Sequence, residues 1–282
     1  MSRWTIQLNE KVVVITGAGG VLCGAMVLPL LESGAKVALL DLNTHHLEKV
    51  ISICQEYKEN ILSIQANVLD KKSLEHAHQK VLEHFGPCDL LINGAGGNHA
   101  KATTSHELFT LEDALEDDVT TFFDLQEEGI DAVFKLNFLG TLLPTQVFAK
   151  DMLGKEGCSI INISSMNAYK PLTKIPAYSS AKAAISNFTQ WLAVYFSKQN
   201  IRVNAIAPGF FITEQNYSLL VDKEGAYTAR ANKILNHTPM ERFGTPEELI
   251  GTVMYLLDPN FSGFVNGVVI PIDGAFSAYS GV

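Results

Sequence analysis

Short apolar runs that alternate with helical patterns along the whole chain are the feature that most constrains its fold. The runs are almost uninterrupted, which is typical of strands in a parallel sheet covered by helices on both faces. Helices between parallel strands make right-handed crossovers. We therefore predict one α/β domain over residues 1–282 with a doubly wound, mostly parallel sheet. Its predicted strands are 11–16, 36–41, 61–65, 89–93, 159–164, 202–207 and 268–271, and its clearest helices are 71–85 and 177–199.

Composition excludes several classes of protein. With 47% hydrophobic residues in a chain of 282, there is enough apolar material for a large core. A net charge of −9 argues against a nucleic-acid partner, and no apolar run reaches the ~20 residues that cross a bilayer. Residues 1–11 lack the apolar block of a signal peptide, so we expect a cytoplasmic protein. The four cysteines have no CxxC spacing and are predicted to be buried free thiols, with no metal site.

Two long segments interrupt the alternation of strands and helices. Residues 99–128, which are rich in acids, follow the fourth predicted strand, and residues 209–240 follow the sixth. Such long connections are usually lids, binding segments or disordered chain. Because both leave the carboxyl ends of strands, where open parallel sheets bind ligands, we expect an insert and a substrate loop beside the site.

A glycine-rich turn follows the first predicted strand. Gly17, Gly19 and Gly20 precede a helix that opens at Val21 and Leu22. Glycines let the backbone approach a pyrophosphate, and the N-terminus of a helix offers unpaired N–H groups. The turn therefore predicts a dinucleotide site, and a tight turn without a ligand is the alternative.

Asp41 ends the second predicted strand. A carboxylate there accepts hydrogen bonds from the ribose hydroxyls of an adenosine and repels a 2′-phosphate, so NAD is predicted rather than NADP. No Arg or Lys follows within several residues to hold such a phosphate. The alternative role for Asp41 is to cap the helix that begins near Thr44. A second glycine-rich strand end, at 93–97, would let a cofactor lie against the backbone or would form a simple turn.

Tyr178 and Lys182 lie one turn apart on a predicted helix and share a face. We expect the Lys182 ammonium to lower the pKa of Tyr178 from ~10, so that the phenol exchanges protons near neutral pH. Ser165 closes the fifth strand, and Asn137 lies in a helical pattern. The alternatives are a half-buried tyrosine beside a solvated lysine, and an asparagine that is satisfied in the core or bends its helix.

Taken in order, these motifs resemble the classical short-chain dehydrogenase/reductases over nearly the whole chain. The resemblance implies a Rossmann-type sheet, catalysis of hydride transfer at a carbonyl or alcohol, and a homotetramer. The motifs that support it are the glycine-rich turn, Asp41, Asn93 to Gly96, Asn137, Ser165, Tyr178 with Lys182, Pro208 with Gly209, and Asp273 with Gly274.

The resemblance also implies roles for single residues. Tyr178 would act as general acid or base at the substrate oxygen, and Ser165 would donate a hydrogen bond to that oxygen. Lys182 would hold the nicotinamide ribose and tune Tyr178, Asn137 would anchor a water-linked proton relay, and Thr213 would contact the carboxamide. The implied cofactor contacts are Gly17, Gly19, Gly20, Val21, Leu22, Asp41, Asn67, Val68, Asn93, Ala95, Gly96, Tyr178, Lys182, Pro208, Gly209, Phe211 and Thr213.

Three features depart from the family pattern. Val21 and Cys23 stand where the family usually has glycines, which puts the phosphate contacts in doubt and leaves a nucleotide-binding sensor as a non-enzyme alternative. Asn67 stands where an Asp commonly meets the adenine, although its amide oxygen can still accept a hydrogen bond. The segment 99–128 is longer than the family norm.

The turn, the motif Asn93 to Asn98 and the acidic insert together resemble the sugar-acid members of the family, the D-mannonate oxidoreductase (fructuronate reductase) type, with gluconate 5-dehydrogenases as close relatives. The implied reaction interconverts a keto-sugar acid and its hydroxy acid; a steroid, an acyl-carrier ketone or a polyol is the rival substrate. Because the net charge is negative, a sugar acid needs a local cationic patch. Candidate substrate residues are Asn98, Lys101, Asn167 and Arg230, followed by His99, Lys170, Gln215, Asn216 and Lys233, with Lys101 and Arg230 as carboxylate partners.

Overall fold

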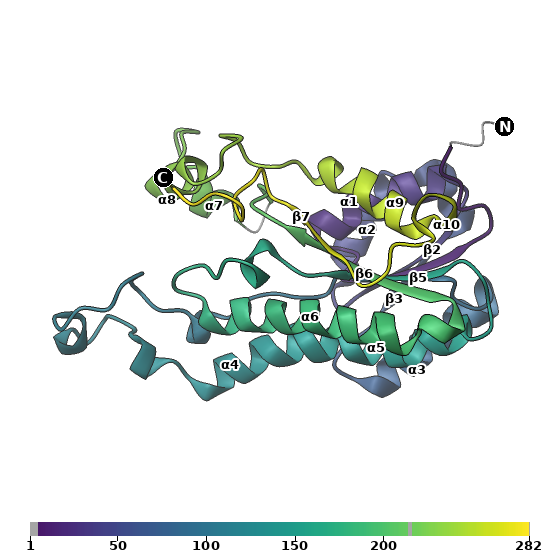
Figure 1. The fold of residues 1–282 in the computed structure, drawn as a ribbon, viewed down its shortest axis with the longest axis horizontal. Coiled ribbons are helices and arrows are strands. Elements are labelled where there is room, and N and C mark those ends of the chain that lie inside the picture. The colour runs from purple at the N-terminus through teal and green to yellow at the C-terminus, as the bar shows by residue number, and fades with distance from the viewer. Residues whose placement is uncertain (1–4, 214–215, 282) are drawn as a thin grey trace.

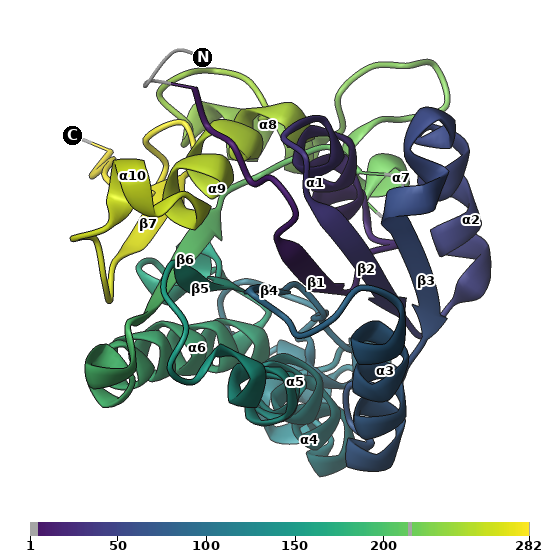
Figure 2. The same cartoon turned by 90° about the vertical axis from the view of Figure 1, so that its right-hand side faces the viewer.

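The computed structural model describes residues 5–213 and 216–281, and they build one seven-stranded sheet between two layers of helices (Figures 1 and 2). The strand order is β3-β2-β1-β4-β5-β6-β7, and every neighbouring pair is parallel. The predicted doubly wound fold is therefore confirmed, with a sheet that is wholly parallel. The strands are β1 (Val12–Thr16), β2 (Lys36–Asp41), β3 (Ile61–Gln65), β4 (Leu90–Asn93), β5 (Cys158–Ile163), β6 (Ile201–Pro208) and β7 (Val269–Ile272).

Each strand is apolar on both sides because each face of the sheet is covered. On β1, the side chains of Val13 and Ile15 join one core cluster, whereas Val12 and Val14 join the other. The first cluster lies under α1 (Val21–Glu32), α2 (Thr44–Ser52) and α9 (Ile250–Leu257), near α10 (Pro259–Ser262). The second lies under α3 (Lys71–His84), α5 (Gly140–Phe148) and α6 (Pro176–Tyr195), and Figure 2 shows the two layers on opposite sides of the sheet.

Helix α6 is the longest helix and carries the tyrosine and lysine of the predicted site. It begins with Pro176 at its first position, where the missing N–H costs nothing. The helix ends at Tyr195, earlier than the predicted residue 199, and a 3₁₀ turn, Ser197–Gln199, follows. Asn200 then adopts a φ of 57°, a left-handed conformation that asparagine tolerates and that leads the chain into β6.

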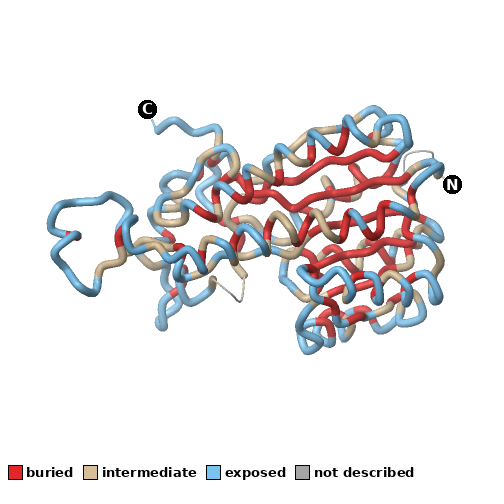
Figure 3. Tube along the Cα trace, turned by 90° about the horizontal axis from the view of Figure 1, so that it is seen from below, coloured by how far each residue is buried: buried red, intermediate tan, exposed pale blue. Residues whose placement is uncertain are grey.

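The predicted insert forms an arm that projects from the body (Figures 1 and 3). It has three short 3₁₀ turns, Ala100–Ala102, Asp113–Leu115 and Phe122–Asp124, before α4 (Glu127–Phe134) and a π-helical segment, Lys135–Leu139. Figure 3 shows that most of the arm is exposed. The second long segment is partly helical, with α7 (Tyr217–Leu220) and α8 (Ala229–Asn236) packed around a small cluster of their own.

All four cysteines are buried and free, as predicted. Within the described ranges, no helix is long and apolar enough to cross a membrane. The same residues contain no group of histidine, cysteine and acidic side chains that could hold a metal ion.

Candidate active site

Ser165 and Tyr178 meet at the carboxyl edge of the sheet. Ser165 lies just beyond β5, is buried, and caps the 3₁₀ turn Met166–Ala168, where its hydroxyl accepts from the N–H of Asn167 at 3.2 Å. Tyr178 lies in the first turn of α6. The Ser165 hydroxyl lies close enough to the Tyr178 phenol to lower its pKa, so the structure brings the two hydroxyl groups together.

Lys182 lies one turn further along α6 and is only 4% exposed. Its Nζ is 5.6 Å from the centre of the Tyr178 ring. The same Nζ donates to the carbonyl oxygen of Ile163 at 2.8 Å, and this carbonyl belongs to the last residue of β5. The lysine therefore ties α6 to the strand that leads to Ser165, rather than being solvated as the alternative interpretation had it.

The prediction that Lys182 lowers the pKa of Tyr178 is wrong for the protein without a bound cofactor. Burial raises the pKa of Tyr178 to about 12, and the hydrogen bond with Ser165 acts in the opposite direction. Burial also lowers the pKa of Lys182 to about 8, against a smaller rise caused by Cys23. Removal from water thus disfavours the charged form of both groups and is the largest cause of both pKa shifts. Tyr178 is held as a neutral phenol.

Asn137 is fully buried in the π-helical segment and locks the chain that leaves β4. Its Nδ2 donates to the carbonyl oxygens of Gly97 at 2.7 Å and of Val133 at 2.8 Å, and its Oδ1 accepts from the N–H of Gly97 at 3.3 Å. A Cβ at Gly96 would stand 2.7 Å from Asn137 Oδ1 and 3.1 Å from Lys182 Nζ. Only glycine leaves room there, so the strand end, the asparagine and the lysine form one tightly packed unit.

The glycine-rich turn has the features that a dinucleotide phosphate needs. Gly17 adopts a φ of 65°, and a Cβ there would stand 2.8 Å from the backbone nitrogen of Ala95. The N-cap of α1 is Gly20, which supplies no side-chain hydrogen bond, and the first turn of α1 holds no acid. The N–H groups of this helix end are therefore open to an anion.

Asp41 lies beside this turn at the end of β2. Its carboxylate accepts from the N–H of Gly19 at 3.0 Å and from the N–H of Asn43 at 2.9 Å. The N-cap of α2 is Asn43, so the alternative role of Asp41 as a helix cap is wrong. A ribose placed at the glycine-rich turn would meet this carboxylate, which fits NAD.

One departure from the family pattern is complementary in space to a glycine at the end of β4. Cys23 stands where the family usually has glycine, and its thiol lies against Gly94. A Cβ at Gly94 would lie 2.1 Å from Cys23 Sγ. The thiol therefore fills the space that a side chain at position 94 would need, and burial raises the pKa of Cys23 to about 12. The glycine-rich turn therefore differs from the family pattern in its packing but remains well packed.

The other predicted cofactor residues line the same edge. Asn67 is exposed and accepts from the N–H of Leu69 at 3.0 Å, while Val68 is buried against Gly140. Asn93 is buried and donates to Thr145 and Asn162, each at 2.9 Å. Beyond β6, Gly209 donates to the carbonyl oxygen of Ile272 at 2.9 Å, the ring of Phe211 packs on Gly244 in the core, and the N–H of Thr213 donates to Asn216 at 2.8 Å.

A pocket of about 570 Å³ opens between the segments that leave β5, β6 and β7. One wall, 170–174, is the chain that connects Ser165 to Tyr178, and α8 forms another. Four cations against one acid make the pocket locally positive in a chain whose net charge is −9. The charged or titratable side chains that line it are Glu107, Lys170, Lys174, Arg230, Lys233 and His237.

The structure separates the predicted substrate residues into two groups. Arg230, Lys170 and Lys233 line this pocket. Lys101 instead forms an exposed ion pair with Glu128 at 2.6 Å, and Asn98 donates to Thr103 at 3.0 Å.

Four further predicted substrate residues lie outside the cationic pocket lining or outside the described residues. His99 accepts from the N–H of Lys101 at 3.2 Å, and Asn216 donates to the carbonyl oxygen of Phe211 at 2.8 Å. Asn167 is buried beside Ser165, and Gln215 lies outside the described residues. The prediction missed Glu107 and Lys174, whose only signal in the sequence was a charge on a segment that follows a strand.

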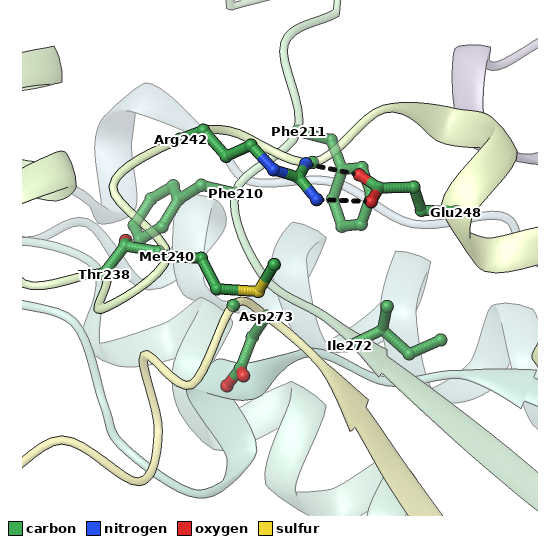
Figure 4. A pocket seen from close by; sticks show the side chains of 10 residues that line it. Phe210, Phe211, Thr238, Met240, Arg242, Glu248, Ile272 and Asp273 are labelled. Carbon is green, nitrogen blue, oxygen red and sulfur yellow. Dashed lines mark hydrogen bonds and ion pairs between the residues drawn. The ribbon is translucent and has the colours of Figure 1, made fainter.

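A smaller pocket of about 100 Å³ is also lined by Phe210 (Figure 4). Its arginine, Arg242, donates to both carboxylate oxygens of Glu248 at 2.7 and 2.6 Å. Its second acid, Asp273, accepts from two backbone N–H groups. The charged side chains of this pocket already pair with other groups of the protein, which distinguishes it from the cationic pocket.

The chain is similar to known oxidoreductases over its whole length. The sequence model of the short chain dehydrogenase family matches residues 11–223. An uncharacterised oxidoreductase of Haemophilus influenzae is 58% identical over 98% of this chain and 96% of its own length. A 2-dehydro-3-deoxy-D-gluconate 5-dehydrogenase of Dickeya dadantii is 30% identical over 97% and 98%. A provisionally assigned D-mannonate oxidoreductase from Haemophilus influenza, crystallised with NAD, superposes with a TM-score of 0.93 at 58% identity, covering 98% of each chain.

Proposed function

The chain belongs to the short-chain dehydrogenase family, and we propose that it uses NAD(H) to interconvert a keto-sugar acid and its hydroxy acid, with D-fructuronate and D-mannonate as the pair. The observation that carries the proposed chemistry is the meeting of Ser165, Tyr178 and Lys182 at the edge of the sheet. The sugar-acid substrate is supported by the cationic pocket and by the relatives that are named for sugar acids.

In this proposal the residues of the chain position a carbonyl and supply a proton. When bound, NADH supplies the hydride. The Ser165 hydroxyl hydrogen-bonds the substrate oxygen, and Tyr178 gives its proton to that oxygen as the alcohol forms. A phenol whose pKa is raised to about 12 keeps its proton at neutral pH, so it can donate that proton to the carbonyl oxygen during keto-acid reduction. Lys182 would hold the nicotinamide ribose, and Asn137 fixes the chain that leaves β4 through its hydrogen bond to Gly97.

The proposed NAD site uses the open N-terminus of α1 for the pyrophosphate and Asp41 for the adenosine ribose. The proposed substrate carboxylate binds to Arg230, whose guanidinium has no ion pair among the described residues and can pair with both carboxylate oxygens. Segment 170–174 lines the pocket and lies in the chain between Ser165 and Tyr178, which supports the proposal that one ligand reaches both sites.

The direct test is a substrate panel followed at the absorbance band of the reduced nicotinamide. We expect D-fructuronate to oxidise NADH and D-mannonate to reduce NAD, with slower rates for NADP(H). Turnover of 5-ketogluconate and gluconate instead would make the protein a gluconate 5-dehydrogenase. Activity with a ketosteroid alone, or none with any sugar acid, would refute the proposed function.

We also propose that residues 1–282 fold as one domain and that four copies form a homotetramer. Helix α6 presents Trp191 and Tyr195, which are 56% and 65% exposed and stacked at 4.8 Å, on the side away from the sheet. Exposed aromatic rows of this kind mark protein interfaces. Light scattering should give four times the 30.8 kDa chain mass, and Trp191→Glu should reduce it. A cytoplasmic location is proposed because buried free thiols suit a reducing compartment.

A further inference from the structure

Glu107 brings a carboxylate from the projecting arm into the cationic pocket. It is the only acid among the described residues that line this pocket. Its side chain forms an ion pair with Lys233 of α8, 126 positions along the chain. The arm, whose length distinguishes this chain from the family pattern, thus contributes a charge to the wall where the substrate is proposed to bind.

The carboxylate of Glu107 is ionised at neutral pH. The hydrogen bond from Lys233 lowers its pKa, against a rise caused by burial, and the charges of Lys174 and Arg230 lower it further. Three cations of the pocket therefore act on one carboxylate. Only one of them, Lys233, is paired with it.

Two of the remaining cations are available to a substrate carboxylate. Lys170 donates to the carbonyl oxygen of Tyr279, which lies outside the pocket lining. Lys174 and Arg230 have no ion pair in the part of the chain that the structure describes, and both face the pocket. One substrate carboxylate can bind between them, whereas a second would approach Glu107 and meet a like charge.

We propose that Glu107 is a specificity-determining residue that disfavours dicarboxylates relative to a sugar acid with one carboxylate. The proposal rests on the proposed function and deepens it. Glu107 cancels the charge of Lys233 and offers carboxylate oxygens that accept hydrogen bonds from substrate hydroxyl groups. Without this acid the pocket has one more net positive charge, which strengthens its attraction for a second carboxylate.

The test compares gluconate and glucarate, which share a six-carbon polyhydroxy chain and differ in whether one end is a carboxylate. Binding of each to the NAD-loaded protein is measured by calorimetry at low ionic strength, because the ion pair is partly exposed and salt screens it. We expect the wild type to prefer gluconate. In Glu107→Gln the affinity ratio should shift toward glucarate by about tenfold, the scale of one unit charge at a partly solvated site.

A second variant separates charge balance from damage to the arm. Glu107→Gln combined with Lys233→Gln restores the net charge of the wild-type pocket, so the ratio should return to within about threefold of the wild-type value. Glu112→Gln is the matched control, because Glu112 is exposed on the same arm but does not line the pocket, and it should leave the ratio unchanged.

Three outcomes would overturn the inference: an unchanged ratio in Glu107→Gln, a shifted ratio that the double variant does not reverse, or no binding of either acid to the wild type. Turnover of D-fructuronate is measured in the same preparations. If the wild type turns over this substrate while the ratio does not respond to Glu107→Gln, the specificity role fails and the proposed function stands.

Discussion

The edge of the sheet and the cationic pocket differ in how their polar side chains are held. At the sheet edge, Asn137 and Lys182 are buried, and each is hydrogen-bonded to backbone groups of neighbouring elements. In the pocket, Arg230 and Lys174 lie on irregular or short helical segments and have no ion pair among the described residues. The proposed proton-transfer residues are therefore held by well-packed elements, whereas the proposed substrate contacts are cations without an ion partner among the described residues.

The largest expected effect comes from the sheet edge. Tyr178→Phe removes the proposed proton donor and the hydrogen bond with Ser165 but keeps the ring that packs near Lys182. Turnover should fall by about 10³- to 10⁴-fold, in line with the loss of a positioned acid, while NADH affinity changes less than about threefold. Steady-state kinetics and fluorescence titration measure the two quantities. Turnover near the wild-type rate would remove Tyr178 from the mechanism.

Gly96→Ala tests whether the sheet edge is as rigid as its packing indicates. The added Cβ would press on Asn137 Oδ1 and Lys182 Nζ, at 2.7 and 3.1 Å, so both side chains must shift. We expect turnover to fall by about 10²-fold, the usual cost of a displacement near 1 Å. Gly251→Ala is the control, since a Cβ there meets nothing within 4 Å. Full activity in both variants would show that the packing around Gly96 can adjust to a Cβ, and it would contradict a rigid sheet edge.

The residues of the rigid region were predictable because regular elements repeat known spacings. A four-residue step on a helix places Tyr178 and Lys182 on one face, and the carboxyl ends of parallel strands meet at one edge. Their pKa values were not predictable. Spacing shows that two groups are near each other, whereas burial, which is the largest cause of both pKa shifts, depends on the whole packed structure.

Pairs that are distant in sequence escaped prediction altogether. Nothing in the chain relates Cys23 to Gly94, yet the thiol fills the space above that glycine. Likewise, Lys101 and Glu107 lie on the same insert, but the lysine pairs with Glu128 and the acid reaches α8. A charge on a long irregular segment can be recognised as a candidate from sequence. Its partner is decided by the path of the segment.

Substitution of one arginine in each pocket tests whether only the cationic pocket binds the substrate carboxylate. Arg230→Gln should raise KM for the sugar acid by about 30-fold and leave kcat within about threefold, because it removes binding shared by ground and transition states. Arg242→Gln is the matched control, since its guanidinium is held by Glu248 (Figure 4). Its KM should stay near the wild-type value. Equal rises in both variants would contradict a specific carboxylate site at Arg230.

The smallest expected effect is a dependence of stability on pH that is caused by Lys182 at the sheet edge. Burial lowers the pKa of Lys182 to about 8 from an ordinary value of 10.5, so between these values the unfolded chain binds more protons than the folded one. The free energy of unfolding should then rise with pH, by roughly 1 kcal/mol between pH 7 and pH 9. Tyr178, with its pKa raised to about 12, has the opposite effect, but only above pH 10.

Denaturant unfolding of the wild type and of Lys182→Met at pH 7, 8 and 9 isolates this contribution. The variant keeps an unbranched side chain but cannot titrate, so the difference between the two profiles cancels the other ionisable groups. The free energy of unfolding of the wild type should gain on that of the variant as pH rises. A constant difference across this range would mean that Lys182 remains solvated enough to keep its ordinary pKa, and the contrast between a desolvated catalytic edge and an open cationic pocket would lose its physical basis.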